Sequence, residues 1–166
     1  MKKLIIINGT MGIGKSTVCS ILLDTLKPSV YLDGDWCWNM NPFLVSEENK
    51  KMVIDNITHL LKSYLDNSGY EYIIFCWVIH QENIFRKLLE PLKNYDFELY
   101  KVSLVCSETA LKSRLEIDVQ NGVRQDDVID RSVQRMELYN NMDTIKIDVS
   151  NIDPKQTAIE IVKLVE

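Results

Sequence analysis

The sequence predicts a single α/β domain built on a parallel β-sheet, and three observations carry that prediction. Apolar residues gather in short, nearly continuous runs, as they do in strands that are covered on both faces. Segments with helical spacing of apolar residues alternate with these runs, which is typical of a parallel sheet. The chain has 166 residues, of which 46% are hydrophobic and 26% charged. That length and composition allow a folded core without disulfides or structural metals.

Five strands are expected. In chain order they are Leu4 to Ile7, Ser29 to Leu32, Tyr72 to Val78, Val102 to Cys106 and Thr144 to Val149. The first helix follows the first strand, because Val18, Leu22 and Leu26 fall on one helical face. It ends before Pro28, which cannot continue a helix.

The later helices carry recognisable start signals. Ser46 can cap a helix whose apolar face runs from Val53 to Leu65, and the acidic residues after it suit the helix dipole. Further helices are expected at 107–119, at 127–139 and from Asp153-Pro154 onward. The polar run from Asp118 to Asp127, around Gly122, is expected to form a lid loop within this one domain of residues 1–166.

Composition narrows the range of partners. The net charge of −5 argues against nucleic acid and against an anionic membrane surface, which need a concentrated basic face. The four cysteines, at 19, 37, 76 and 106, show no metal-binding spacing. Reduced thiols, together with the lack of a signal peptide or a membrane-spanning run, predict a cytoplasmic protein. The sequence does not indicate the oligomeric state.

One motif dominates the functional prediction. Directly after the first strand, Gly9 to Ser16 reads Gly-x4-Gly-Lys-Ser, the phosphate-loop (P-loop, Walker A) pattern. The loop amides and the following helix can hold phosphates, Lys15 can reach the β and γ phosphates of ATP, and Ser16 can ligate Mg²⁺. The predicted nucleotide contacts are Gly9, Thr10, Met11, Gly12, Ile13, Gly14, Lys15, Ser16 and Thr17.

Two carboxylates follow the second strand. In an extended segment Asp33 and Asp35 point to the same side and face the P-loop across the mouth of the sheet. We expect Asp33 to serve Mg²⁺ and Asp35 to take a proton from an attacking hydroxyl. The alternative is a simple Asp-Gly turn with solvated carboxylates.

With these motifs the chain resembles the small P-loop kinases, a group that includes shikimate kinase, gluconate kinase and chloramphenicol phosphotransferase. The resemblance rests on the P-loop, on Asp33 and Asp35, and on the stretch from Ser107 to Leu115. It implies a three-layer P-loop fold with strand order 2-3-1-4-5. It also implies a lid whose arginines close over the transferring phosphate, with Arg124 reaching the phosphates and Arg114 lying along the adenine. For Arg131, a salt bridge to Asp127 is an equal alternative.

Aromatic residues indicate where an acceptor could bind. Trp36, Trp38 and Trp77 lie at the predicted carboxyl ends of the second and third strands, the edge where parallel sheets bind ligands. We expect them to form an apolar slot with Arg86 as a polar contact. Asn39, Phe43 and His80 are further candidates, and the alternative is that each tryptophan is ordinary core.

The expected activity is transfer of the γ-phosphate of ATP, with Mg²⁺, to a hydroxyl or phosphate of a small-molecule acceptor. Lys15, Asp35 and Arg124 are the expected catalytic residues. The third strand ends in Phe75-Cys76-Trp77 and lacks the acidic pair of motor and AAA-type ATPases, so metal help must come from Ser16 and Asp33. The alternative function is a nucleotide-binding module that acts as a switch for a partner protein without transferring phosphate.

Overall fold

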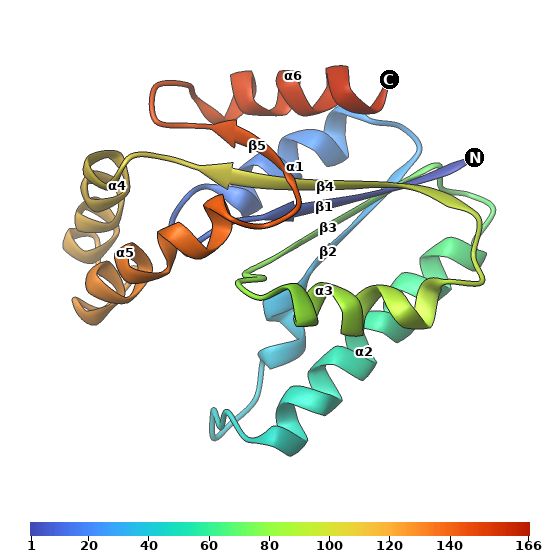
Figure 1. Ribbon diagram of the computed structural model, residues 1–166, viewed down its shortest axis with the longest axis horizontal. Helices are drawn as coiled ribbons and strands as arrows, with labels where there is room; N and C mark the ends of the chain where they lie inside the picture. Colours follow the sequence, from blue (N-terminus) through green and yellow to red (C-terminus); the bar gives the residue numbers. More distant parts are fainter.

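The computed structural model describes residues 1–166, and its centre is a five-stranded, all-parallel sheet. The strands lie in the order β2-β3-β1-β4-β5, as the resemblance implied (Figure 1). Their bounds are β1 Lys2–Asn8, β2 Ser29–Asp33, β3 Tyr72–Trp77, β4 Phe97–Val105 and β5 Ile145–Asp148. The predicted fold class is therefore confirmed.

Helices cover both faces of the sheet, so the domain has three layers. In Figure 1, α1 and α6 lie on one face and α2 and α3 on the other, while α4 and α5 pair beside the carboxyl ends of the strands. The helices are α1 Lys15–Thr25, α2 Glu47–Asp66, α3 Glu82–Leu89, α4 Glu108–Gln120, α5 Asp127–Asn140 and α6 Pro154–Val165, with 3-10 helices η1 Gly34–Trp38 and η2 Glu90–Leu92. None of them combines the length and the apolar character needed to cross a bilayer.

The core consists of two large apolar clusters, one on each side of the sheet. Alternate residues of β1 enter different clusters: Leu4 and Ile6 pack toward α2 and α3, and Ile5 and Ile7 pack toward α1 and α6. Because both faces are covered, the central strands read as continuous apolar runs. A third, smaller cluster around Leu115 joins α4 to α5.

Helix starts follow the sequence signals closely. The Ser46 side chain accepts from the Asn49 amide (3.1 Å), Ser107 accepts from Ala110 (3.2 Å), and Asp153 forms a capping box with Gln156. These contacts satisfy amides that the first turn of a helix leaves free.

Three elements differ from the expectations. Strand β4 begins at Phe97 rather than Val102. The sequence did not indicate its first half, because polar and partly exposed residues there interrupt the apolar run. Helix α3 was not expected from the sequence. The α4–α5 connection is also shorter than the expected lid, since α4 continues to Gln120 and leaves only residues 121–126 as a loop.

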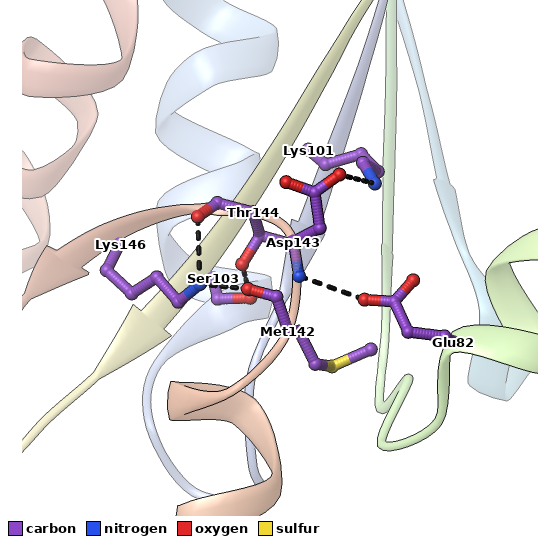
Figure 2. Close-up of polar contacts among 7 residues, drawn as sticks. All are labelled: Glu82, Lys101, Ser103, Met142, Asp143, Thr144 and Lys146. Atoms are coloured by element: carbon purple, nitrogen blue, oxygen red, sulfur yellow. Dashed lines mark hydrogen bonds and ion pairs between the residues drawn. The ribbon is translucent and has the colours of Figure 1, made fainter.

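A polar cluster holds the end of α5 and the start of β5 in place (Figure 2). Thr144 donates to Ser103 of β4 (2.7 Å), and the Asp143 amide donates to Glu82, in the first turn of α3 (2.9 Å). The Asp143 carboxylate also pairs with Lys101 (3.5 Å). These contacts tie the α5–β5 turn to β4 and to α3, so α5 is anchored at its far end.

Candidate active site

The P-loop connects β1 to α1 in the predicted place. Gly9, Gly12 and Gly14 all adopt positive φ angles (148°, 81° and 100°) that L-residues rarely adopt. At Gly12 a side chain would also collide with Leu115 of α4. The loop therefore needs glycine both for its own turn and for the close packing of α4.

A cavity of about 500 Å³ lies over this loop, and we call it the loop cavity. Its size is within the range of small-molecule sites. The predicted residues that line it are Met11, Gly12, Ile13, Gly14, Lys15, Ser16, Thr17, Asp33, Asp35, Trp77, Arg114 and Arg124. Gly9 and Thr10 do not line the cavity. Their carbonyls accept hydrogen bonds from Lys15, and the Thr10 hydroxyl donates to the Ser132 carbonyl of α5 (3.2 Å).

Lys15 folds back onto the loop that carries it. Its Nζ donates to the carbonyls of Gly9 and Thr10, both at 2.9 Å. Burial lowers the pKa of Lys15, while the nearby carboxylates of Asp33 and Asp35 act in the opposite direction. A phosphate group in the cavity would add negative charge beside this half-buried ammonium.

Ser16 and Asp33 meet at one side of the loop cavity. The Ser16 hydroxyl donates to Asp33 Oδ2 (3.1 Å), although the two residues belong to α1 and β2. Hydroxyl and carboxylate oxygens are the donors that Mg²⁺ prefers, and Mg²⁺ usually takes one or two protein oxygens together with phosphates and water. These two oxygen donors fit such a metal, and the chain offers no group of three or more His, Cys, Asp or Glu residues that could hold one.

The segment after Asp33 corrects the geometry assumed from the sequence. It is not extended: Asp33 caps the 3-10 helix η1, and its Oδ1 accepts from the Asp35 amide (2.9 Å). Both carboxylates nevertheless line the loop cavity. Burial raises the pKa of Asp35, and the charge of Asp33 raises it further, while Lys15 and Arg124 act against both. A carboxyl group with a raised pKa is suited to accept a proton near neutral pH.

The far end of the loop cavity is formed by residues that the sequence analysis missed. Val149, Ile152, Asp153, Pro154 and Thr157 line it, from the end of β5 to the first turn of α6. Arg114 crosses this end and donates to the carbonyls of Val149 (2.6 Å) and Ile13 (3.4 Å). The rule that parallel sheets bind ligands at their carboxyl edge could have pointed to the end of the fifth strand as it did to the second.

The predicted lid arginines lie in two different situations. Arg124 lines the loop cavity but pairs with Asp118 of α4 (3.0 Å), and both side chains are about one-third exposed. Arg131 lies outside the cavity and pairs with Asp127 (3.7 Å), which is the alternative that the sequence left open.

A second cavity, of about 660 Å³, lies between α2 and α3, and we call it the α2–α3 cavity. It contains three of the predicted acceptor contacts: Trp38, Trp77 and Arg86. Trp77 also lines the loop cavity, so its indole is shared by the two cavities. A Cβ at Gly34 would stand 2.5 Å from Cγ of Trp77, which shows how tightly η1 packs on that ring.

Trp36 does not join this aromatic group, which corrects the sequence expectation. Its side chain is 58% exposed and lines neither cavity. It packs edge-on against Tyr31 instead, with ring centroids 5.2 Å apart. The 3-10 turn is the physical reason, because it rotates residue 36 away from the direction that an extended strand would give it. Phe43 packs against Trp38 (5.8 Å) and is otherwise exposed.

Comparison with known families agrees with this geometry. A family model described as "AAA domain" matches residues 5–139, which include the P-loop, both aspartates and most of α5. The chain belongs to this AAA domain family. Curated proteins give no match.

Solved structures that resemble this AAA domain protein share its whole fold. The tunicamycin resistance protein of Deinococcus radiodurans has a TM-score of 0.70 at 17% identity, with 99% of this chain and 96% of that chain covered. The APS kinase of Mycobacterium tuberculosis, in complex with AMPPNP and APS, has a TM-score of 0.67 at 16% identity, with 99% of this chain and 96% of that chain covered. The shikimate kinase of Acinetobacter baumannii, in complex with shikimate, has a TM-score of 0.65 at 17% identity, with 99% of this chain and 93% of that chain covered.

Although the chain matches the AAA domain family, its strand β3 does not end in acidic residues. That strand ends in Phe75-Cys76-Trp77, and the carboxylates that face the P-loop come from the end of β2 and from η1. Ser16 and Asp33, which are hydrogen-bonded to each other, are among the oxygen donors that line the loop cavity on that side.

Proposed function

We propose that this protein is an ATP-dependent phosphotransferase that moves the γ-phosphate of ATP to a hydroxyl or phosphate of a small-molecule acceptor. The observation that carries the proposal is Trp77, whose side chain lines both cavities, while Asp35 lines the loop cavity together with the P-loop. The P-loop and the Ser16–Asp33 pair line the first cavity, and the second contains Trp38 and Arg86. A γ-phosphate on Lys15 would then lie close to the boundary with a second substrate.

The proposed chemistry assigns one role to each side chain. Lys15 and the loop amides hold the phosphates of ATP, and Arg114 lies beside the base. Mg²⁺, when bound with the nucleotide through Ser16 and Asp33, neutralises charge on the phosphates. Asp35 accepts the proton of the acceptor hydroxyl. The oxygen of that hydroxyl bonds to the γ-phosphorus, and the bond from this phosphorus to the bridging oxygen breaks, so that ADP leaves.

The short loop at residues 121–126 is proposed as the lid. It connects α4 and α5, which pack directly on the P-loop through Leu115 and the Thr10–Ser132 contact. Closure over the phosphates would exclude water and would bring Arg124 from Asp118 toward the transferring group. Amide hydrogen exchange over residues 118–127 tests this, because protection should rise only when both substrates are present.

The α2–α3 cavity is proposed as the acceptor site. Trp38 and Trp77 offer apolar area for a ring, and Arg86, which has no ion-pair partner, offers a charge at the rim. The proposal also includes a cytoplasmic location, which is in keeping with the four free cysteines.

The deciding experiment is a screen of nucleosides, nucleotides, sugar acids and antibiotic alcohols for acceptor-dependent release of ADP. An acceptor that raises ADP release in the wild type, but not in Asp35→Asn, supports transfer. A switch module would instead bind ATP and give no acceptor-dependent release with any compound. In that case Asp35 would also be dispensable for nucleotide binding and for the partner's response.

A further inference from the structure

Tyr31 contacts the proposed metal carboxylate but has no role in the function described above. It lies two residues before Asp33 on β2, so both side chains point to the same side of the strand. The Tyr31 hydroxyl donates to Asp33 Oδ2 at 3.1 Å. The same carboxylate oxygen accepts from Ser16, also at 3.1 Å.

These contacts leave the Asp33 carboxylate little freedom. Oδ2 receives two hydroxyl donors, and Oδ1 receives the amide of Asp35 at 2.9 Å. Strand β2 is an edge strand with β3 as its single neighbour, so the sheet holds its end from one side only. Tyr31 is the side chain that fixes Asp33 from within β2 itself.

Tyr31 is in turn held from two directions. Its hydroxyl oxygen lies 3.2 Å from Cys76 Sγ on β3, and because the phenol has one proton, used on Asp33, the thiol is the donor in that contact. The Trp36 ring closes the outer side. A chain of hydrogen bonds therefore runs from Cys76 through Tyr31 to Asp33, where the Ser16 hydroxyl meets it.

We propose that Tyr31 is a positioning residue that holds the Asp33 carboxylate on Ser16 and thereby sets how strongly Mg²⁺ supports nucleotide binding. The inference rests on the proposed function, because it takes Ser16 and Asp33 as the metal side of an ATP site. Residues that orient a metal ligand typically change metal affinity by about 10- to 100-fold when they are removed. Tyr31 acts through Asp33 and touches neither substrate.

The test compares nucleotide binding with and without metal in the purified protein. The dissociation constant of AMPPNP, which cannot transfer its phosphate, is measured by calorimetry in EDTA and in saturating Mg²⁺. The ratio of the two constants reports how much the metal adds to binding. Tyr31→Phe keeps the ring and removes the hydroxyl, and it should lower this ratio about tenfold while leaving binding in EDTA unchanged.

Two further variants show whether the effect passes through Asp33. In an Asp33→Asn background, adding Tyr31→Phe should change the ratio no further, because groups that act as one unit are not additive. Tyr100→Phe is the matched control: it removes the phenol hydroxyl that donates to the exposed Glu98 (2.7 Å) in the first half of β4 and should leave the ratio at the wild-type value.

The outcomes separate this inference from the proposed function. Wild-type protein that binds no AMPPNP overturns both. Wild-type binding that Mg²⁺ strengthens, with an equal ratio in Tyr31→Phe, overturns the positioning role and leaves the nucleotide site standing. Additive effects of Tyr31→Phe and Asp33→Asn overturn it as well. A lower melting temperature with an unchanged ratio would show that the hydroxyl only stabilises the fold.

Discussion

The loop cavity and the α2–α3 cavity are built in different ways. Most of the phosphate end of the loop cavity comes from one uninterrupted segment, 11–18, whose glycines allow its tight turn. The α2–α3 cavity takes its walls from η1, α2, β3, α3 and η2. Several of its charged side chains are exposed and pair one turn apart on α2, as Lys50 does with Glu47 (2.8 Å) and Lys51 with Asp55 (2.6 Å).

The difference indicates which part of the site is fixed before any ligand arrives. Backbone amides in a closed turn keep their geometry whether or not a phosphate is present. Exposed ion pairs on a helix contribute little and can rearrange at small cost. Substitutions in the P-loop should therefore have large and general effects, whereas those in the α2–α3 cavity should affect acceptor binding alone.

The largest effect is expected at Lys15. Because Lys15 lines the loop cavity and carries the positive charge of the P-loop, Lys15→Ala should remove most nucleotide binding and all detectable transfer. In the wild type, Mg-ATP at a hundredfold excess over its dissociation constant should stabilise the fold by about 2.7 kcal/mol. Thermal melting with and without Mg-ATP measures this, and the variant should lose most of the shift.

Lys163→Ala is the matched control, since Lys163 is exposed on α6 and pairs only with Glu160 (2.8 Å). It should keep the full response to Mg-ATP. If Mg-ATP does not move the melting temperature of the wild type either, the P-loop does not bind nucleotide and the contrast between the two cavities disappears.

The same contrast explains what the sequence could predict. The P-loop was readable because its spacing, its preceding strand and its following helix all lie within 25 residues, and the structure has them in the expected places. Caps such as Ser46 and Ser107 were readable for the same reason. Helix α3 carries a helical pattern too, since Ile84, Phe85, Leu88 and Leu89 share one face, but its eight residues are too few for the periodicity to stand out.

Tertiary packing decided what the sequence could not. The turn at η1 depends on Gly34 fitting against Trp77, a residue 43 positions later, so no local pattern showed that Trp36 would point outward. The residues from Val149 to Thr157 reach the loop cavity only because β5 lies next to β4. The contact of Tyr31 with Cys76 exists only because β2 lies next to β3.

A large but more selective effect is expected at the two aspartates. Asp35→Asn should keep Mg-ATP affinity and lower transfer by 10²- to 10⁴-fold, the usual contribution of a general base. Asp33→Asn should instead shift the Mg²⁺ requirement to higher concentration, because the Asp33 carboxylate is hydrogen-bonded to Ser16, its proposed partner in metal binding. Steady-state rates over a Mg²⁺ series distinguish the two. Near wild-type turnover in Asp35→Asn would show that this carboxylate is a turn residue.

A moderate effect confined to the acceptor is expected at Gly34. In Gly34→Ala the new methyl group would meet Cγ of Trp77 at 2.5 Å, so the indole between the two cavities has to move. We expect a roughly tenfold higher KM for the acceptor, a loss of about 1–3 kcal/mol of stability from overpacking, and unchanged ATP affinity.

The control for that variant is Gly69→Ala, in the turn before β3, where the nearest side-chain atom is Asn67 Oδ1 at 3.0 Å. It should leave both KM values at the wild-type level. A rise in the KM for ATP in Gly34→Ala would show that the two cavities are mechanically coupled rather than independent.

The smallest effect concerns pH and the loop between β3 and α3. Burial lowers the pKa of His80, and Arg135 of α5 lowers it further; its buried Nδ1 has no hydrogen-bond partner. Above the ordinary histidine pKa of about 6.5, the ring is neutral in the folded and unfolded chain and adds no pH dependence. Below that value the unfolded chain takes up a proton that the folded chain resists, so the free energy of unfolding falls as the pH falls.

His80→Gln should therefore lose less stability than the wild type between pH 7.5 and pH 5.5, by about 1–3 °C in melting temperature for a domain of this size. His59 is the only other histidine and is exposed on α2, so His59→Gln should follow the wild-type curve. Because the P-loop contains no histidine, the difference should persist with Mg-ATP bound. Parallel curves for His80→Gln and the wild type would show that the loop after β3 opens easily enough to hydrate the ring. The α2–α3 side of the site would then be more mobile than its exposed ion pairs alone indicate.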